Sequence, residues 1–152
     1  MDKSNLLDEL RLEIGLVRDQ VETLSSFYIG ITRKFANLMQ DRWSSVAIYE
    51  TTSNAFIMKV CAGPCYLERL IPFGESILST VAIRGDLLFQ EEANLQKVFL
   101  PFYKDHHLLG IITGHIPKES YEITEEDFSF VKEVGRFIEV QHEIFYPSNY
   151  RG

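Results

Sequence analysis

An apolar seam near the start of the chain constrains the fold more than any other feature of the sequence. Apolar residues recur alternately three and four positions apart from Leu7 to Leu38. This spacing is typical of one side of a helix, so it predicts a single N-terminal helix over residues 1–40, with Ser4 as its N-cap. The seam consists of Leu7, Leu10, Ile14, Val17, Val21, Leu24, Tyr28, Ile31, Phe35 and Leu38.

The seam needs an apolar surface to cover it. Because it is longer than one small sheet can bury, we expect it to pack against partner helices, either within the chain or in a second copy. Gly15 and Gly30 lower the helix propensity of the segment and are expected to mark bends or close approaches between helices.

A second helix is predicted near the other end of the chain, over residues 124–146. Thr124 followed by Asp127 indicates a capping box at its start, and Pro147 is expected to end it. This helix also carries apolar residues at three–four spacing. The two terminal helices are expected to lie antiparallel, and two copies of the chain would then form a four-helix bundle.

Between the terminal helices, residues 43–117 change to a strand-like pattern. Five or six short apolar segments are separated by turn-forming residues, which predicts an antiparallel sheet. One segment instead has helical spacing and is followed by Gly85, a typical C-cap residue. The chain is therefore predicted to be a single α+β domain. The expected strands are 45–50, 54–63, 68–72, 86–90, 96–104 and 107–116, and the expected embedded helix is 77–85.

The composition narrows the possible partners and compartment. The 152 residues include 22 acidic and 15 basic side chains, a formal net charge of -7, which disfavours nucleic acid and anionic membranes as partners. The sequence shows no apolar run that could span a bilayer and no signal-peptide pattern, so we expect a cytoplasmic protein. Cys61 and Cys65 are then expected to be thiols, and we predict no metal site and no cofactor.

Several short motifs resemble, in combination, those of a GAF domain. Within that superfamily the chain is most similar to the small free-methionine-(R)-sulfoxide reductases. The resemblance covers roughly residues 40–140 and implies a sheet with a small-molecule cavity on it. The motifs are WSSVAIY (43–49), Gly63, RLIPFGES (69–76), VAIRG (81–85), LPFY (100–103), LLGII (108–112) and TEED (124–127).

The chain departs from the reductases at their cysteines. The reactive cysteine after the Gly-rich turn corresponds to Leu78, and the loop that carries the main catalytic cysteine is replaced by the short segment EEANL (91–95). Cys65 lies about three residues from the position of a third family cysteine. Because a thiol relay needs an attacking thiolate and a resolving thiol within reach, we predict that the protein is not an enzyme.

The acidic residues that hold the amine of an amino acid in the reductases are also replaced. The corresponding positions in this chain are Lys97, Thr113 and His115. Carboxylates suit an ammonium group, whereas a lysine, a histidine and helix N–H donors suit an anion or a carboxylate. The alternative is that Lys97 is a solvated strand-end lysine and His115 a hydrogen-bonded histidine of the sheet.

Five further residues are predicted to line the cavity. The resemblance places Trp43 at the ligand, because it matches the family tryptophan before the first strand. Ser76 opens the embedded helix, where N-capping alone could explain it. Core packing is the commoner role for each aromatic or aliphatic member taken alone. The five residues are Trp43, Phe73, Ser76, Ile77 and Tyr103.

The resemblance implies a small-molecule sensor. Such a protein would bind its ligand in the cavity and act as a homodimer, through its terminal helices, on a separate regulatory protein such as a histidine kinase. Two alternatives stay open: a divergent free-methionine-(R)-sulfoxide reductase, and a structural dimerisation module whose cavity is filled by side chains.

Overall fold

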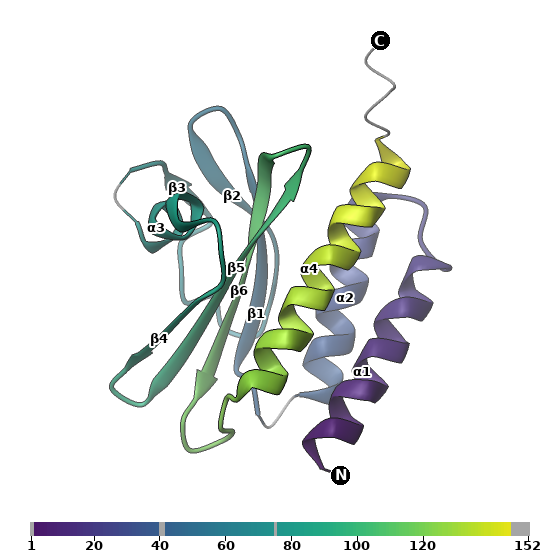
Figure 1. The fold of residues 1–152 in the computed structure, drawn as a ribbon, viewed down its shortest axis with the longest axis vertical. Helices are drawn as coiled ribbons and strands as arrows, with labels where there is room; N and C mark the ends of the chain where they lie inside the picture. The colour runs from purple at the N-terminus through teal and green to yellow at the C-terminus, as the bar shows by residue number, and fades with distance from the viewer. Residues whose placement is uncertain (1, 40–41, 75, 147–152) are drawn as a thin grey trace.

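In the described part of the chain, six strands form one antiparallel sheet (Figure 1). The strands are β1 (Ser45–Thr51), β2 (Ala55–Ala62), β3 (Leu70–Pro72), β4 (Leu88–Glu92), β5 (Leu95–Lys104) and β6 (His107–Pro117). Their order is β3-β2-β1-β6-β5-β4, which places the long, largely buried strands β5 and β6 inside the sheet. The structure is a computed structural model and describes residues 2–39, 42–74 and 76–146.

Four helices accompany the sheet within these residues: α1 (Lys3–Arg18), α2 (Leu24–Leu38), α3 (Ile77–Arg84) and α4 (Glu125–Phe145). α1, α2 and α4 lie on one side of the sheet, which we call the helix face, and α3 lies on the other side, the α3 face (Figure 1). This arrangement confirms the predicted α+β fold with an antiparallel sheet. It also confirms the embedded helix, which ends at Gly85 in the left-handed conformation.

The prediction of a single N-terminal helix is wrong, because α1 ends at Arg18 and a separate helix follows. Thr23 starts α2 as its N-cap, and its hydroxyl oxygen accepts a hydrogen bond from the Ser26 N–H at 3.1 Å. The seam residues of both helices are buried in one common core, so the seam is covered within the chain. α1 itself is capped by Asp2, whose side chain accepts from the Asn5 N–H, and not by Ser4.

α1 and α2 approach each other closely at Gly30, as expected for one of the two helix glycines. A Cβ atom at this position would lie 2.4 Å from Cγ1 of Val17, so only glycine lets the helices pack at this distance. Gly15 has no neighbour within 4 Å of such an atom and marks no close approach.

The predicted capping box at the start of α4 is present and links α4 to α1. The Asp127 carboxylate is 1% exposed and accepts hydrogen bonds from the Thr124 N–H at 2.9 Å and the Tyr121 hydroxyl at 2.6 Å. Lys3 Nζ lies 2.8 Å from the same carboxylate. Because the first residues of α1 contact the first turn of α4, these two helices run parallel, so the expected antiparallel arrangement is wrong for α1. It holds for α2, whose early Phe27 packs on Phe137 and whose later Phe35 packs on Phe130. Pro147 lies outside the described residues.

The two faces of the sheet carry two separate apolar clusters, because side chains alternate between the faces along each strand. Val46, Ile48, Val98, Leu100 and Ile112 share one apolar cluster with the helix face, in which α2 and α4 lie against the sheet and α1 packs on these two helices. A smaller cluster on the α3 face consists of Ala47, Tyr49, Phe56, Leu78, Val81, Phe99 and Ile111.

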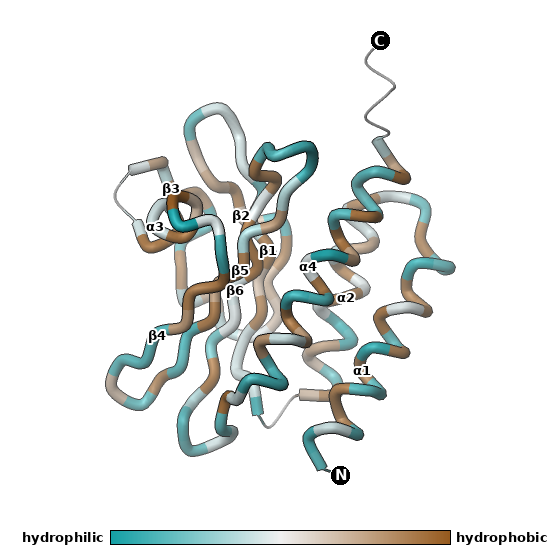
Figure 2. Tube along the Cα trace, viewed as in Figure 1, coloured by the Kyte–Doolittle hydropathy of each residue, from teal (hydrophilic) through white to brown (hydrophobic). Residues whose placement is uncertain are grey.

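In Figure 2 apolar stretches follow the strands and the inner sides of the helices, and the hairpin tips are hydrophilic. None of the helices in residues 2–39, 42–74 and 76–146 combines the length and the hydropathy that a bilayer crossing requires.

Candidate functional site

Three of the predicted ligand residues meet on the α3 face, on two neighbouring strands. Lys97 on β5 is the direct cross-strand partner of His115 on β6. Thr113 lies two residues before His115 on the same strand. Side chains two residues apart share a face of a sheet, and Thr113 pairs with Phe99 of the α3-face cluster. The strand register therefore brings Lys97, Thr113 and His115 together.

His115 is buried and uncharged at neutral pH. Its side chain is 3% exposed, its ring is stacked on Tyr66 with 4.4 Å between ring centroids, and its Nδ1 atom has no hydrogen-bond partner among the described residues. Burial, and secondly the nearby Lys97 ammonium, lower the pKa of His115 to about 4. His115 can therefore offer one N–H donor and one acceptor to a ligand, but no positive charge.

Lys97 is the cross-strand neighbour of this histidine, but its ammonium group is already paired. Its Nζ atom lies 2.9 Å from Oε1 of Glu92 on the neighbouring strand β4, and its side chain is 21% exposed. Glu92 is mostly exposed, so the pair is of the weak surface kind. An anion on the α3 face could therefore compete with Glu92 for the ammonium group.

Residues 63–69 between β2 and β3, which we call the covering loop, close the site above His115. The loop starts at Gly63 with φ of 86°, where a Cβ atom would lie 2.1 Å from the Ser44 carbonyl oxygen, so glycine is required. Hydrogen bonds hold the loop down: the Tyr66 and Ser44 hydroxyls are 2.8 Å apart, and the Tyr49 hydroxyl donates to the Glu68 carbonyl oxygen at 2.7 Å.

Tyr66 also borders a pocket of about 450 Å³. Because Tyr66 both lines this pocket and stacks on His115, its side chain contacts the pocket and the polar residues of β5 and β6. Two of the predicted site residues, Phe73 and Ser76, line the pocket as well. The full lining consists of Tyr66, Leu67, Glu68, Leu70, Ile71, Pro72, Phe73 and Ser76.

Ser76 is the N-cap residue of α3 by position, but its hydroxyl makes no capping hydrogen bond. The Ser76 Oγ atom is buried and has no partner among the described residues. Capping alone therefore does not explain this serine. The next residue, Ile77, packs against the α3-face cluster.

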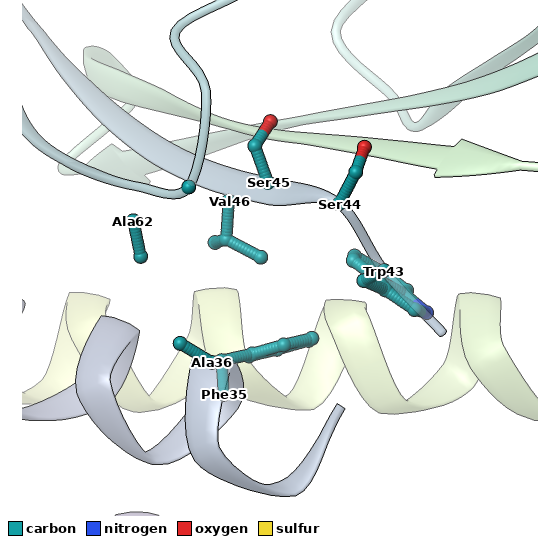
Figure 3. Close-up of a pocket in the computed structure, with 8 residues that line it drawn as sticks. Phe35, Ala36, Trp43, Ser44, Ser45, Val46 and Ala62 are labelled. Carbon is teal, nitrogen blue, oxygen red and sulfur yellow. The ribbon is translucent and has the colours of Figure 1, made fainter. Parts of the chain in front are cut away.

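Trp43 lies on the helix face, away from the other predicted site residues (Figure 3). Its ring packs against Phe35 of α2 with 4.8 Å between centroids. The indole also covers Gly114, where a Cβ atom would lie 2.5 Å from Trp43 Cζ3. In Figure 3 Val46 and Ala62 point toward α2, and together with Trp43 they line a small cavity of about 180 Å³. Trp43 thus has the core-packing role, which was the alternative to ligand binding in the sequence analysis.

Tyr103 also lies apart from the site, near the opposite end of β5. It is six residues from Lys97, a span of roughly 20 Å in a strand, and its hydroxyl would lie 3.5 Å from a Cβ atom on Gly85. Its backbone N–H donates to Glu139 of α4 at 2.7 Å. Burial raises the pKa of the Tyr103 hydroxyl. Most of the predicted site residues thus lie on the α3 face near Tyr66, whereas Trp43 and Tyr103 lie elsewhere.

The positions that matter for thiol chemistry lie next to this group, on the α3 face. Leu78, at the position of the reactive family cysteine, is completely buried in the α3-face cluster. Cys61 is half-buried, and burial, followed by contact with the Cys65 thiol, raises its pKa to about 12. Within the described residues, no three histidine, cysteine or acidic side chains gather to hold a metal ion.

Sequence reasoning missed Tyr66 and Ser44, which together hold the covering loop. Neither residue belongs to a periodic pattern, and only Ser44 lies within a recognised motif. The single local signal is the turn-forming pair Gly63 and Pro64 just before Tyr66, which indicates a loop but not where its aromatic residue points.

Comparisons with known proteins identify the fold. No family model and no curated protein sequence matches the chain. Among solved structures, free methionine-R-sulfoxide reductase from Neisseria meningitidis superposes with a TM-score of 0.80 at 16% identity, over 94% of this chain and 92% of that one.

Two GAF domains are similarly close in structure. A putative GAF sensor protein from Burkholderia vietnamiensis has a TM-score of 0.76 at 14% identity, over 91% of this chain and 89% of that one. The GAF domain of an Acinetobacter phosphoenolpyruvate-protein phosphotransferase has a TM-score of 0.74 at 14% identity, over 97% and 99%. At such identities the likeness defines the architecture only, and by that measure the chain has a GAF-like fold.

Proposed function

We propose that this protein is a non-catalytic sensor that binds a small anionic or carboxylate-bearing ligand on the α3 face. The observation that carries the proposal is a pair of buried polar atoms that lack partners among the described residues: His115 Nδ1, in the ring that Tyr66 stacks on, and Ser76 Oγ, in the pocket that Tyr66 lines. Buried polar groups are nearly always hydrogen-bonded in folded proteins, so a ligand that supplies partners to both would be stabilised there.

The charges around these atoms favour an anion. Neutral His115 can donate its N–H to a carboxylate oxygen, the Ser76 hydroxyl can donate to a second oxygen, and the Lys97 ammonium supplies the positive charge. Binding requires Tyr66 to leave the His115 ring, which would join the pocket of about 450 Å³ to the polar residues. Phe73 would then cover the apolar part of the ligand.

The output of such a sensor would be carried by the helix face. We propose a homodimer in the cytoplasm that acts on a separate regulatory protein such as a histidine kinase. The exposed apolar residues Leu12 and Leu16 on α1 and Val140 and Ile144 on α4 support this, because they offer a surface outside the core. Sedimentation of the purified chain tests the dimer, and a strict monomer at all concentrations would contradict it.

Thermal unfolding with nitrate, acetate and succinate tests ligand binding. At a ligand concentration of about 100 Kd the folded state gains about 2.7 kcal/mol, which corresponds to a rise in Tm of roughly 5–10 °C for a chain of this size. Lys97→Met should abolish the rise. Lys118→Met is the matched control, because Lys118 forms a similar pair with an acidic residue of β4, Glu91, at the same distance of 2.9 Å.

Two other functions have some support. The buried side chains of the α3-face cluster, such as Phe99 and Leu78, favour a structural module with a filled cavity. No thermal shift with any anion, together with a stable dimer, would support that function instead. The structural likeness to a sulfoxide reductase favours a divergent reductase. Consumption of free methionine sulfoxide with a thiol reductant, lost in Cys65→Ser, would establish it.

A further inference from the structure

The covering loop begins beside two thiols that lie close together. The Cys61 thiol, near the end of β2, donates to the Gly63 carbonyl oxygen at 3.7 Å and to the Pro64 carbonyl oxygen at 3.8 Å. Pro64 directly precedes Cys65, so the Cys61 sulfur lies beside the backbone of Cys65. Both cysteines are free thiols in this structure.

The two thiols differ in access. Cys65 is exposed, whereas Cys61 is half-buried against the α3-face cluster. Burial of Cys61 raises the pKa of its thiol to about 12, which makes it a poor first nucleophile. An oxidant from solution would therefore meet Cys65 first, and Cys61 is placed to resolve the product.

We propose that Cys61 and Cys65 form a reversible intrachain disulfide that locks the covering loop over His115. The oxidant is a hydroperoxide. The Cys65 thiolate attacks the terminal peroxide oxygen, so an S–O bond forms, the O–O bond breaks, and water or an alcohol leaves. The Cys61 sulfur then attacks the Cys65 sulfenic acid, the S–S bond forms, and the departing hydroxide takes the Cys61 proton as water. Two thiols lose two electrons to the peroxide, and a dithiol reductant reverses the change.

The position of Tyr66 explains why the disulfide would act on the site. Tyr66 follows Cys65 directly, stacks on His115 and contacts Ser44 through its hydroxyl. The thiols lie close together while the loop is closed, so a bond between them fits the closed loop and restricts residues 62–65. The proposed disulfide and its effect on the loop do not depend on the proposed function. Only the consequence for ligand entry rests on that function.

The experiment compares the reduced full-length chain with the chain treated with hydrogen peroxide. Mass spectrometry of the intact chain and of its peptides should show the loss of two hydrogens and a bond between Cys61 and Cys65. Diethyl pyrocarbonate, which reacts with neutral imidazole, should label His115 at least threefold more slowly after oxidation. The exposed His106, on the β5–β6 hairpin, is the internal control and should label at one rate in both forms.

Three variants separate the steps. Cys65→Ser and Cys61→Ser should form no disulfide, and peroxide should leave their His115 labelling unchanged. Tyr66→Ala should form the disulfide and yet label rapidly at His115 in both redox states. An intrachain disulfide that leaves His115 labelling unchanged overturns the proposal, and so does cross-linking between chains without an intrachain bond.

Thermal shifts with nitrate, acetate and succinate in both redox forms keep the two proposals distinguishable. If the Tm of the oxidised form rises only after a longer incubation with the anion than that of the reduced form, the disulfide controls ligand entry. If no anion shifts the Tm in either form, the proposed ligand function fails, whereas the disulfide is judged by the labelling data alone.

Discussion

The two faces of the sheet are built on different principles. The helix face buries large side chains from three helices, and residues such as Phe27 and Ile138 are completely excluded from water. The α3 face is covered only by one short helix and the covering loop, and Phe73 and Tyr66 remain about two-fifths exposed there. The same sheet thus presents one thoroughly covered face and one partly open face.

The two faces differ in what surrounds their buried polar groups. On the helix face, Asp127 is bonded to Lys3 and Tyr121, while Trp43 Nε1 and Gln141 Nε2 lack partners among the described residues. On the α3 face, His115 Nδ1 and Ser76 Oγ also lack such partners. These two atoms lie next to Tyr66 and to the pocket that it lines, where a ligand could supply the missing hydrogen bonds.

The sharpest test of the contrast removes one aromatic ring from the helix face. Phe27→Ala should lower the free energy of unfolding by about 3–5 kcal/mol, because the ring is fully buried and packs on Phe137. Urea denaturation measures the change. Leu12→Ala on the exposed side of α1 is the control and should change it by less than about 0.5 kcal/mol. A loss below about 1 kcal/mol for Phe27→Ala would contradict a tightly packed helix face.

Acid should act mainly on the α3 face. Burial holds the pKa of His115 near 4 in the folded chain, against 6.5 when it is exposed, so protonation favours unfolding. Neutral His115 therefore carries no penalty above pH 6.5. As the pH falls toward 4, the free energy of unfolding decreases by about 3 kcal/mol because the unfolded chain binds the proton more tightly. Burial lowers the pKa of His142 on the helix face as well, with the same sign.

Unfolding measured between pH 7 and pH 4 tests the contribution of His115. His115→Gln should remove most of the loss in this range, while His106→Gln, on the exposed hairpin, should leave it unchanged. An identical pH profile for His115→Gln and the unaltered chain would assign the acid sensitivity to other groups.

A charge-to-amide change tests the polar network of the helix face. Asp127→Asn should cost about 1–3 kcal/mol, because an amide cannot accept from the Thr124 N–H, Tyr121 and Lys3 as the carboxylate does. Glu126→Gln is the matched control on the same turn. Glu126 accepts a hydrogen bond from the Ser4 hydroxyl at an exposed position. The Glu126→Gln variant should therefore lose no more than about 0.5 kcal/mol of unfolding free energy. Equal losses for the two variants would show that burial of Asp127 does not matter.

The smallest effect is expected at the covering loop. Tyr66→Ala should cost less than about 1 kcal/mol, because the ring is partly exposed and the loop keeps its hydrogen bond between Tyr49 and Glu68. Urea denaturation of this variant beside Phe27→Ala compares two aromatic deletions on opposite faces. A cost above about 2 kcal/mol would make the covering loop part of the core and weaken the contrast.

Much of the fold follows from local sequence signals, and one large error shows where such signals stop. Gly85 and the capping box at Thr124 and Asp127 were predictable, because each is set by the backbone of a few residues. The single N-terminal helix was wrong because a seam has the same spacing whether its halves lie end to end or fold back on each other. Only the N-cap at Thr23, bonded to Ser26, reveals the break locally.

The site was predictable in part for a similar reason. Lys97, Thr113 and His115 share a face because alternation along two paired strands leaves no other arrangement. Trp43 precedes β1 and is outside that alternation, so its side of the sheet depends on how the chain enters the strand and on the space above Gly114. Tyr66 belongs to a loop whose path is set by tertiary contacts, which no periodicity in the sequence encodes.

The strand order has a consequence for self-association. Both edges of the sheet are formed by its shortest strands, β3 with three residues and β4 with five. The β4 edge also carries Glu91 and Glu92, which discourage a neighbouring molecule from adding a strand. The long apolar strands β5 and β6 are thus paired on both sides, and the segments most prone to form amyloid-like contacts become available only if an edge strand detaches.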